Sequence, residues 1–116
     1  FSPMQYINFI DKFPKKCFGI NYDTGNSASL GFDPIEEFKT YGDRIMNVHI
    51  KDRVFNGSSV PIFEGDVNFK LIFELLSKYQ YDGNIILQTA RSHNKKDFDL
   101  INNYKKTMEE LILNYI

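Results

Sequence analysis

Three short hydrophobic runs divide the chain, and a polar or ionisable residue stands at the end of each. The runs span residues 17–22, 45–50 and 84–87. Asp23 follows the first run, His49 lies where the second gives way to charged residues, and Gln88 follows the third. Runs of this length are typical of strands in a parallel sheet whose faces are covered by helices. Because the carboxyl ends of parallel strands meet at one edge, the three residues predict one shared site.

Four segments with helical periodicity surround these runs. The predicted helices span residues 2 to about 13, 33 to about 42, a segment that starts at Asp66 or Asn68, and about 97 to the end. Ser2-Pro3 and Asp33-Pro34 each place a capping side chain before a proline, which is a common helix start. The last helix carries a regular hydrophobic stripe, which predicts a buried face. The first members of this stripe are Phe98, Ile101, Tyr104 and Met108.

The order of elements is one helix followed by three strand–helix units. This alternation predicts an α/β fold with a parallel sheet joined by right-handed crossovers. Residues 23–27 are expected to form only the turn after the first strand. The long loop between residue 51 and the third helix lies at the predicted site, and loops of that size usually contribute to a site.

The length, composition and net charge of the chain narrow the class of protein. A chain of 116 residues suits one domain, and 42% hydrophobic with 25% charged residues describes a globular protein. The net charge of -1 gives no electrostatic reason to expect a nucleic acid or an anionic membrane as partner. No apolar run approaches the roughly 20 residues of a membrane span. We therefore expect a cytoplasmic protein.

Two further observations concern the beginning of the chain. Cys17 is the only cysteine, which excludes an intrachain disulfide, and because it begins a predicted strand we expect a buried, inert thiol. The chain starts at Phe1 rather than at methionine, and a helix start follows at once. This suggests a piece of a longer protein.

Asp23 and His49 are the candidates for a metal site. Adjacent parallel strands lie about 4.8 Å apart, so side chains from both strand ends can reach one ion. A carboxylate and an imidazole suit Mn²⁺, Zn²⁺, Co²⁺ or Fe²⁺. The alternative is that Asp23 holds the following turn by accepting backbone N–H bonds, while His49 is a hydrogen-bonded histidine at the rim.

Cationic residues flank these positions. Lys51 and Arg53 could bind an anionic substrate, but an ion pair with Asp52 on a solvated loop is the alternative. Arg91 and Ser92, together with residues 57–59, could cradle a phosphate, since barrel enzymes often bind phosphate near their last two strands. His93 is expected to be solvated.

Four ordered motifs resemble one known family, the xylose-isomerase-like sugar phosphate isomerases and epimerases. The motifs cover roughly residues 17 to 91 and are fairly specific as a set. They are Tyr22-Asp23-Thr24-Gly25-Asn26, Val48-His49-Ile50-Lys51-Asp52-Arg53, Val60-Pro61 with Glu64-Gly65-Asp66-Val67-Asn68-Phe69, and Gly83-Asn84-Ile85-Ile86-Leu87-Gln88-Thr89-Ala90-Arg91.

The resemblance implies the C-terminal half of a (β/α)8 TIM barrel, with three parallel strands, four helices and residues 1–116 as a single partial domain. It implies a divalent metal (Mn, Zn, Co or Mg) with Asp23, His49 and Gln88 at ligand positions and a first acid upstream of Phe1. It also implies a small sugar or sugar phosphate as substrate. Asn26 resembles a substrate-contacting position, and Lys51, Arg53 and Arg91 are expected to bind substrate as well.

Gln88 stands where the family has a second acid. In the family's epimerases, two glutamates on opposite sides of the substrate remove and return a proton, and Gln88 corresponds to one of them. The resemblance implies His49 and Gln88 as the catalytic residues of this chain. An amide can bind a metal or a sugar hydroxyl but cannot act as a base near neutral pH. A one-base isomerisation, a lyase-like step, and carbohydrate binding or subunit assembly without turnover therefore stay open. Abasic-site endonuclease chemistry on this fold needs more than two histidines, and the near-neutral charge opposes it.

A three-stranded piece of a barrel has two unpaired sheet edges. We expect it to need a partner, either the missing N-terminal half or a second copy of the chain. We also expect the inner face of the strands to expose a large apolar surface.

Overall fold

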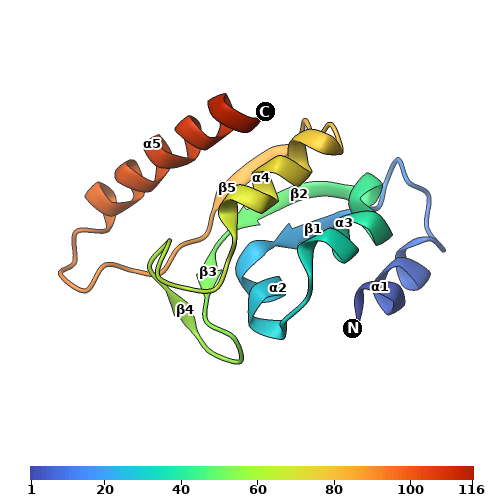
Figure 1. Ribbon diagram of the computed structural model, residues 1–116, viewed down its shortest axis with the longest axis horizontal. Coiled ribbons are helices and arrows are strands. Elements are labelled where there is room, and N and C mark those ends of the chain that lie inside the picture. Colours follow the sequence, from blue (N-terminus) through green and yellow to red (C-terminus); the bar gives the residue numbers. More distant parts are fainter.

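A three-stranded parallel sheet forms the centre of the computed structural model, which describes residues 1–116 (Figure 1). Its strands are β1 (Ile20–Asp23), β2 (Ile45–Ile50) and β5 (Asn84–Leu87), in the order β1-β2-β5. The predicted α/β fold is confirmed, although β1 starts later than expected. Residues before it form a turn in which the amide of Cys17 donates to the carbonyl of Pro14 at 3.0 Å. Cys17 is exposed, so the prediction of a buried thiol was wrong.

The four predicted helices are present, and the structure contains a fifth. They are α1 (Pro3–Ile10), α3 (Pro34–Tyr41), α4 (Phe69–Lys78) and α5 (Asp97–Tyr115), and a short 3-10 turn (Gly42–Arg44) follows α3. Asn68, not Asp66, caps α4. No helix combines the length and the apolarity that a membrane span requires.

The fifth helix, α2 (Thr24–Leu30), occupies the segment that was expected to be a turn. Asp23 caps it by accepting the N–H of Asn26 at 2.8 Å, and Gly31 ends it with φ 73°. Between these two residues the sequence has no hydrophobic periodicity, and only Ala28 and Leu30 are strong helix formers. The caps therefore define α2, and a periodicity argument misses it.

Most of the core lies between the outer face of the sheet and the helices. Figure 1 shows α3 and α4 on one side of the strands. Val48 and Ile50 are fully buried on that face, and Phe38 of α3 and Phe73 of α4 are buried with them. The stripe of α5 is confirmed at Tyr104 and Met108, whereas Phe98 and Ile101 are 79% and 48% exposed.

The inner face of the sheet is polar, and the expectation of a large apolar surface there was wrong. Strand side chains alternate between faces, so the register groups them in layers. One layer holds the amides of Asn21, Asn47 and Asn84, and Asn47 Nδ2 donates to Asn21 Oδ1 at 2.7 Å. The next holds Asp23, His49 and Ile86. Of these two layers only Ile86 is hydrophobic.

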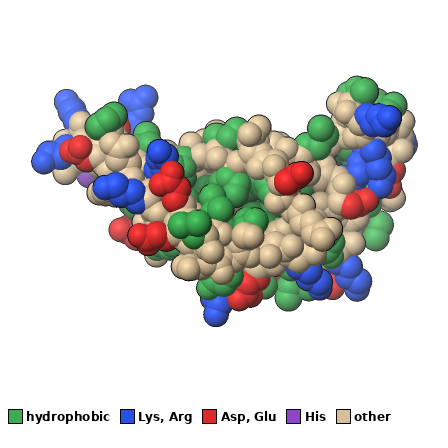
Figure 2. All heavy atoms as spheres, turned by 90° about the horizontal axis from the view of Figure 1, so that it is seen from above, with side chains coloured by type: hydrophobic (Ala, Val, Ile, Leu, Met, Phe, Trp, Pro, Cys, Tyr) green, Lys and Arg blue, Asp and Glu red, His purple; other side chains and the backbone are tan.

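Charged side chains avoid the middle of one face of the molecule. Figure 2 shows lysine and arginine near both ends of the long axis, at the end that holds α1 and the segment after it and at the end that holds the loop before α5. Hydrophobic side chains occupy the middle of this face between the two ends. The split arrangement agrees with the net charge of -1 and leaves no continuous basic surface in this view.

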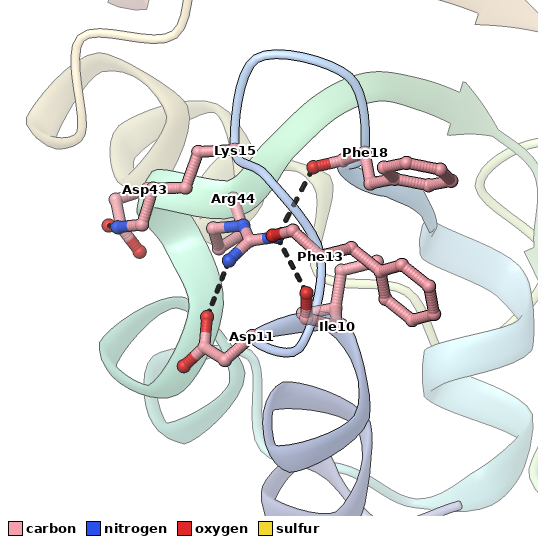
Figure 3. Close-up of polar contacts among 7 residues, drawn as sticks. All are labelled: Ile10, Asp11, Phe13, Lys15, Phe18, Asp43 and Arg44. Carbon is pink, nitrogen blue, oxygen red and sulfur yellow. Dashed lines mark hydrogen bonds and ion pairs between the residues drawn. The ribbon is translucent and has the colours of Figure 1, made fainter.

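A buried arginine holds the N-terminal segment against the opposite end of the sheet from the strand carboxyl ends (Figure 3). Arg44 precedes β2, and its side chain is 2% exposed. Its guanidinium pairs with Asp11 and donates to the backbone carbonyls of Ile10 at 2.9 Å, Phe18 at 3.2 Å and Phe13 at 3.4 Å. One cation thus satisfies the carbonyls at the end of α1 and in the turn before β1.

Replacing Arg44 with alanine should lower the free energy of unfolding by about 2 to 3 kcal/mol, because the buried carbonyls lose their donors. Lys15→Ala is the matched control. Lys15 also pairs with an aspartate in this region, Asp43, but both side chains are about two-thirds exposed, at 64% and 66%. That change should remove less than about 0.5 kcal/mol. Urea denaturation measures both, and equal losses would contradict the assignment.

Candidate functional site

Asp23 and His49 lie side by side on the inner face of the sheet. They are register partners in the parallel pairing of β1 and β2, at or next to the carboxyl end of each strand. Register partners in neighbouring strands project to the same face, and the strands are about 4.8 Å apart. The predicted juxtaposition is therefore confirmed.

Asp23 divides its two carboxylate oxygens between two tasks. Oδ1 accepts the N–H of Asn26 and caps α2. Oδ2 lies 3.8 Å from Lys51 Nζ, and the two side chains are only 11% and 20% exposed. The turn-holding role proposed as the alternative is thus present and uses Oδ1, while Oδ2 faces the Lys51 ammonium group.

His49 and Gln88 share the face of Asp23. His49 is half-buried, and its imidazole makes no hydrogen bond within the chain, so the alternative of a hydrogen-bonded rim histidine is not what is observed. The N–H of Gln88 donates to the carbonyl of Ile50 at 2.9 Å, which continues the β2–β5 ladder one residue beyond β5. Strand alternation then places the exposed Gln88 side chain on the face of Ile86 and His49.

Two of the predicted substrate-binding residues meet at the same end of the sheet. Arg53 Nη1 donates to Asn26 Oδ1 at 2.8 Å, and its Nε and Nη2 donate to the carbonyl of Gly57 at 3.1 and 2.6 Å. The Thr24 hydroxyl, which sequence reasoning missed, donates to the carbonyl of Lys51 at 2.6 Å and accepts its N–H at 3.0 Å. This pair of bonds ties the end of β1 to the end of β2.

Arg91 makes no hydrogen bond or ion pair with Asn26 or Arg53, and it lines a pocket with Gln88 and Asp97. It is exposed, and the N–H of the adjacent Ser92 donates to Asp97 Oδ1 at 2.7 Å. That bond and the neighbouring Arg91 hold the pKa of Asp97 below its usual range. Because a carboxylate already takes this N–H group, the geometry disfavours a phosphate cradle at Arg91 and Ser92. His93 is exposed, as predicted.

The buried carboxylate of Glu37 binds the hydroxyl of Tyr22, a residue of β1. Glu37 is 3% exposed and accepts hydrogen bonds from the hydroxyls of Tyr41 at 2.7 Å, Tyr22 at 3.0 Å and Ser27. Burial, followed by the Glu37 charge, holds the pKa of Tyr22 and of Tyr41 far above the ordinary value. Sequence reasoning missed Glu37 because the pattern of α3 gives no sign of a buried acid.

The donors present fit a divalent metal in type but not in number. Asp23 Oδ2, the His49 imidazole and the Gln88 amide oxygen are chemically suitable ligands. No group of three or more His, Cys, Asp or Glu side chains in the chain is arranged to hold a metal ion. Any metal held here needs further ligands from outside these 116 residues.

Comparison with known proteins identifies the family. The sequence model described as "Xylose isomerase-like TIM barrel" matches residues 1–112. The chain belongs to this family. It is 33% identical over 97 residues to the Escherichia coli protein named "Putative L-ribulose-5-phosphate 3-epimerase SgbU", covering 72% of this chain and 34% of that protein. It is 31% identical over 88 residues to the inosose dehydratase of Lacticaseibacillus casei, covering 60% of this chain and 30% of that enzyme.

A solved structure agrees on the fold. The xylose isomerase domain protein from Planctomyces limnophilus superposes with a TM-score of 0.81 at 20% identity, covering 99% of this chain and 45% of that one. This likeness shows the partial barrel expected from the sequence. The chain spans less than half the length of each of these relatives.

Ionisation of the buried tyrosines should destabilise the protein at high pH. A group whose folded-state pKa is raised contributes its stability fully below the unfolded pKa and loses it as the pH rises. For Tyr22 and Tyr41 the loss should begin near the ordinary value of 10.0. Urea denaturation at several pH values from about 8 to about 11 measures this slope. A variant with Tyr22→Phe and Tyr41→Phe should show a shallower loss, and an unchanged slope would contradict the assignment.

Proposed function

We propose that the chain is the C-terminal part of a metal-dependent enzyme that isomerises or epimerises a sugar or sugar phosphate. The observation that carries the proposal is the register pairing of Asp23 with His49 on the inner face of the sheet. Membership of the xylose isomerase-like family and the likeness to a protein named as an epimerase support it.

Each residue of the cluster has a place in this proposal. Asp23 Oδ2 and His49 would hold a divalent metal, with Gln88 as a third, neutral ligand. When bound, such a metal supplies the positive charge that polarises a carbonyl and a neighbouring hydroxyl. Lys51 and Arg53 would donate hydrogen bonds to substrate oxygens, and Asn26 would hold the Arg53 guanidinium in place, as the 2.8 Å bond between them suggests.

The base that removes the proton next to the carbonyl would come from the upstream part of the barrel. Gln88 cannot fill that role near neutral pH, because an amide has no basic oxygen. We therefore infer a complementary half that supplies a carboxylate and the missing metal ligands. The same half would cover the two free sheet edges. It would also cover the cavity of about 440 Å³ beside β1.

Dehydration of a polyol-derived ketone is the second candidate. Elimination of water needs one base next to the carbonyl and a proton donor at the departing hydroxyl, rather than two opposed carboxylates. The amide at Gln88 favours this chemistry over a symmetric proton exchange, and the likeness to inosose dehydratase supports it. Both candidates use the same metal position and the same first proton removal.

Replacing His49 with alanine in the complete protein should weaken Mn²⁺ binding at least about 100-fold and abolish turnover, because the ion loses a direct ligand. His93→Ala is the matched control, since His93 is exposed in the loop before α5. Calorimetric titration with Mn²⁺ measures the first effect. Unchanged binding in His49→Ala would refute the metal position. Metal binding without turnover of ketoses, ketose phosphates or inososes would instead favour a non-catalytic carbohydrate-binding role.

Gln88→Glu tests whether the side chain at position 88 faces the metal and the substrate. A carboxylate adds charge at the ligand position and should tighten Mn²⁺ binding about tenfold. It also supplies a second base. In heavy water the variant should therefore incorporate deuterium into L-ribulose 5-phosphate at a higher rate than the parent does. Gln80→Glu makes the same change at an exposed turn after α4 and should alter neither measurement. If Gln88→Glu behaves like this control, the side chain does not face the site.

A further inference from the structure

Asp52 is a fully buried carboxylate next to the candidate site, although the sequence suggested a solvated ion pair. It lies in β3 (Asp52–Arg53), which pairs with β4 (Ser59–Val60) in an antiparallel hairpin after β2. Its side chain is 0% exposed and makes no salt bridge. An ionised carboxylate in such a place needs hydrogen-bond donors, and backbone N–H groups supply them.

The donors all come from one short loop. Asp52 Oδ2 accepts the N–H of Phe63 at 2.9 Å and of Gly65 at 3.0 Å, and Oδ1 accepts the N–H of Val67 at 3.3 Å. Alternate residues of the loop thus point their N–H groups at one side chain. Asp66 between them donates its own N–H to the carbonyl of Arg53 at 3.0 Å. The loop is therefore fastened to β3 along its length.

Two features show how closely the loop is fitted to this carboxylate. Phe63 has φ 75°, a left-handed backbone that bulky residues rarely adopt, and its N–H is one of the three donors. A Cβ atom on Gly65 would collide with Asp52 Oδ1 and with the carbonyl of Arg53. The bonds to Asp52 hold the loop in a conformation that it would not keep alone.

The residues on either side of Asp52 are the two cations of the site. Asp52 points into the loop, while Lys51 Nζ lies 3.8 Å from Asp23 and Arg53 Nη1 lies 2.8 Å from Asn26 Oδ1. In an extended segment neighbouring side chains project to opposite sides. Fixing the Asp52 side chain in the loop therefore directs Lys51 and Arg53 toward the end of β1.

We propose that Asp52 is a positioning residue, whose buried carboxylate holds the 61–67 loop and thereby sets Lys51 and Arg53 to receive an anionic substrate group. The inference rests on the proposed function only for the identity of the substrate. It assigns a role to a side chain that touches neither metal nor substrate. Its action on the cations passes through the backbone of β3.

Asp52→Asn and Gly65→Ala break the same contact from its two sides. An asparagine has one oxygen for donors that use both carboxylate oxygens, and the alanine methyl group pushes the loop away from Oδ1. Asp66→Asn is the matched control, because Asp66 is an exposed loop carboxylate that accepts a single N–H, from Phe55 at 2.6 Å. An asparagine oxygen can still accept that bond.

The first measurement is amide hydrogen exchange in the complete protein. Exchange at Phe63, Gly65 and Val67 should be at least about tenfold faster in Asp52→Asn and in Gly65→Ala, and unchanged in Asp66→Asn. The double variant should be no faster than either single one, since both remove one contact. Unchanged exchange in Asp52→Asn would overturn the proposal whatever the protein catalyses.

The second measurement tests the cations. Asp52→Asn should weaken calorimetric binding of inorganic phosphate at least about fivefold, and it should raise KM for L-ribulose 5-phosphate while kcat stays within about twofold. Faster exchange with unchanged phosphate binding would overturn the positioning role, as would a parent protein that binds no phosphate. Weakened phosphate binding in a protein that turns over no ketose, ketose phosphate or inosose would support the role of Asp52 and refute the proposed function.

Discussion

The parallel register between β1 and β2 is the constraint on which the site depends. It pairs Asp23 with His49, and a slip of one residue would send one of them to the opposite face. Two polar links hold this register from both ends. The amide of Asn47 bonds to Asn21 at one level, and the Thr24 hydroxyl bonds twice to the backbone of Lys51 beyond the strand end. A carboxylate and an imidazole are thereby fixed together without touching each other.

The two faces of the sheet have different chemistry, and this difference separates stability from function. The outer face buries Val48 and Ile50 against the helices, so the hydrophobic contribution to folding comes from there. The inner face carries amides, a carboxylate and an imidazole, which gain little from burial unless partners satisfy them. Under the proposed function, these polar groups would face a hydroxyl-rich sugar inside the complete barrel. Their presence also explains why the apolar inner face expected from a half-barrel is absent.

Strand positions and the Asp23–His49 pair could be predicted because both depend on local patterns. Hydrophobic runs mark buried strands, and the residue at the end of each run marks the rim. The helix α2 could not be found in this way, since its caps rather than its periodicity define it. The burial of Asp52 depends on N–H groups more than ten residues away, and that of Glu37 depends on hydroxyls from three elements. Neither arrangement leaves a periodic signal in the sequence.

At Gln88 the backbone sets the position of the residue, while the amide sets what its side chain can do chemically. The bond from its N–H to the carbonyl of Ile50 keeps it in the sheet ladder, so its place relative to His49 is set by backbone geometry alone. A glutamate there would have the same backbone but would add a negative charge and a base. The amide keeps the ability to bind a metal or a hydroxyl and loses the ability to accept a proton near neutral pH. In the proposed function the base is therefore a carboxylate from elsewhere in the barrel, and the amide at Gln88 is the feature that keeps a one-base reaction beside the two-base one as a proposal.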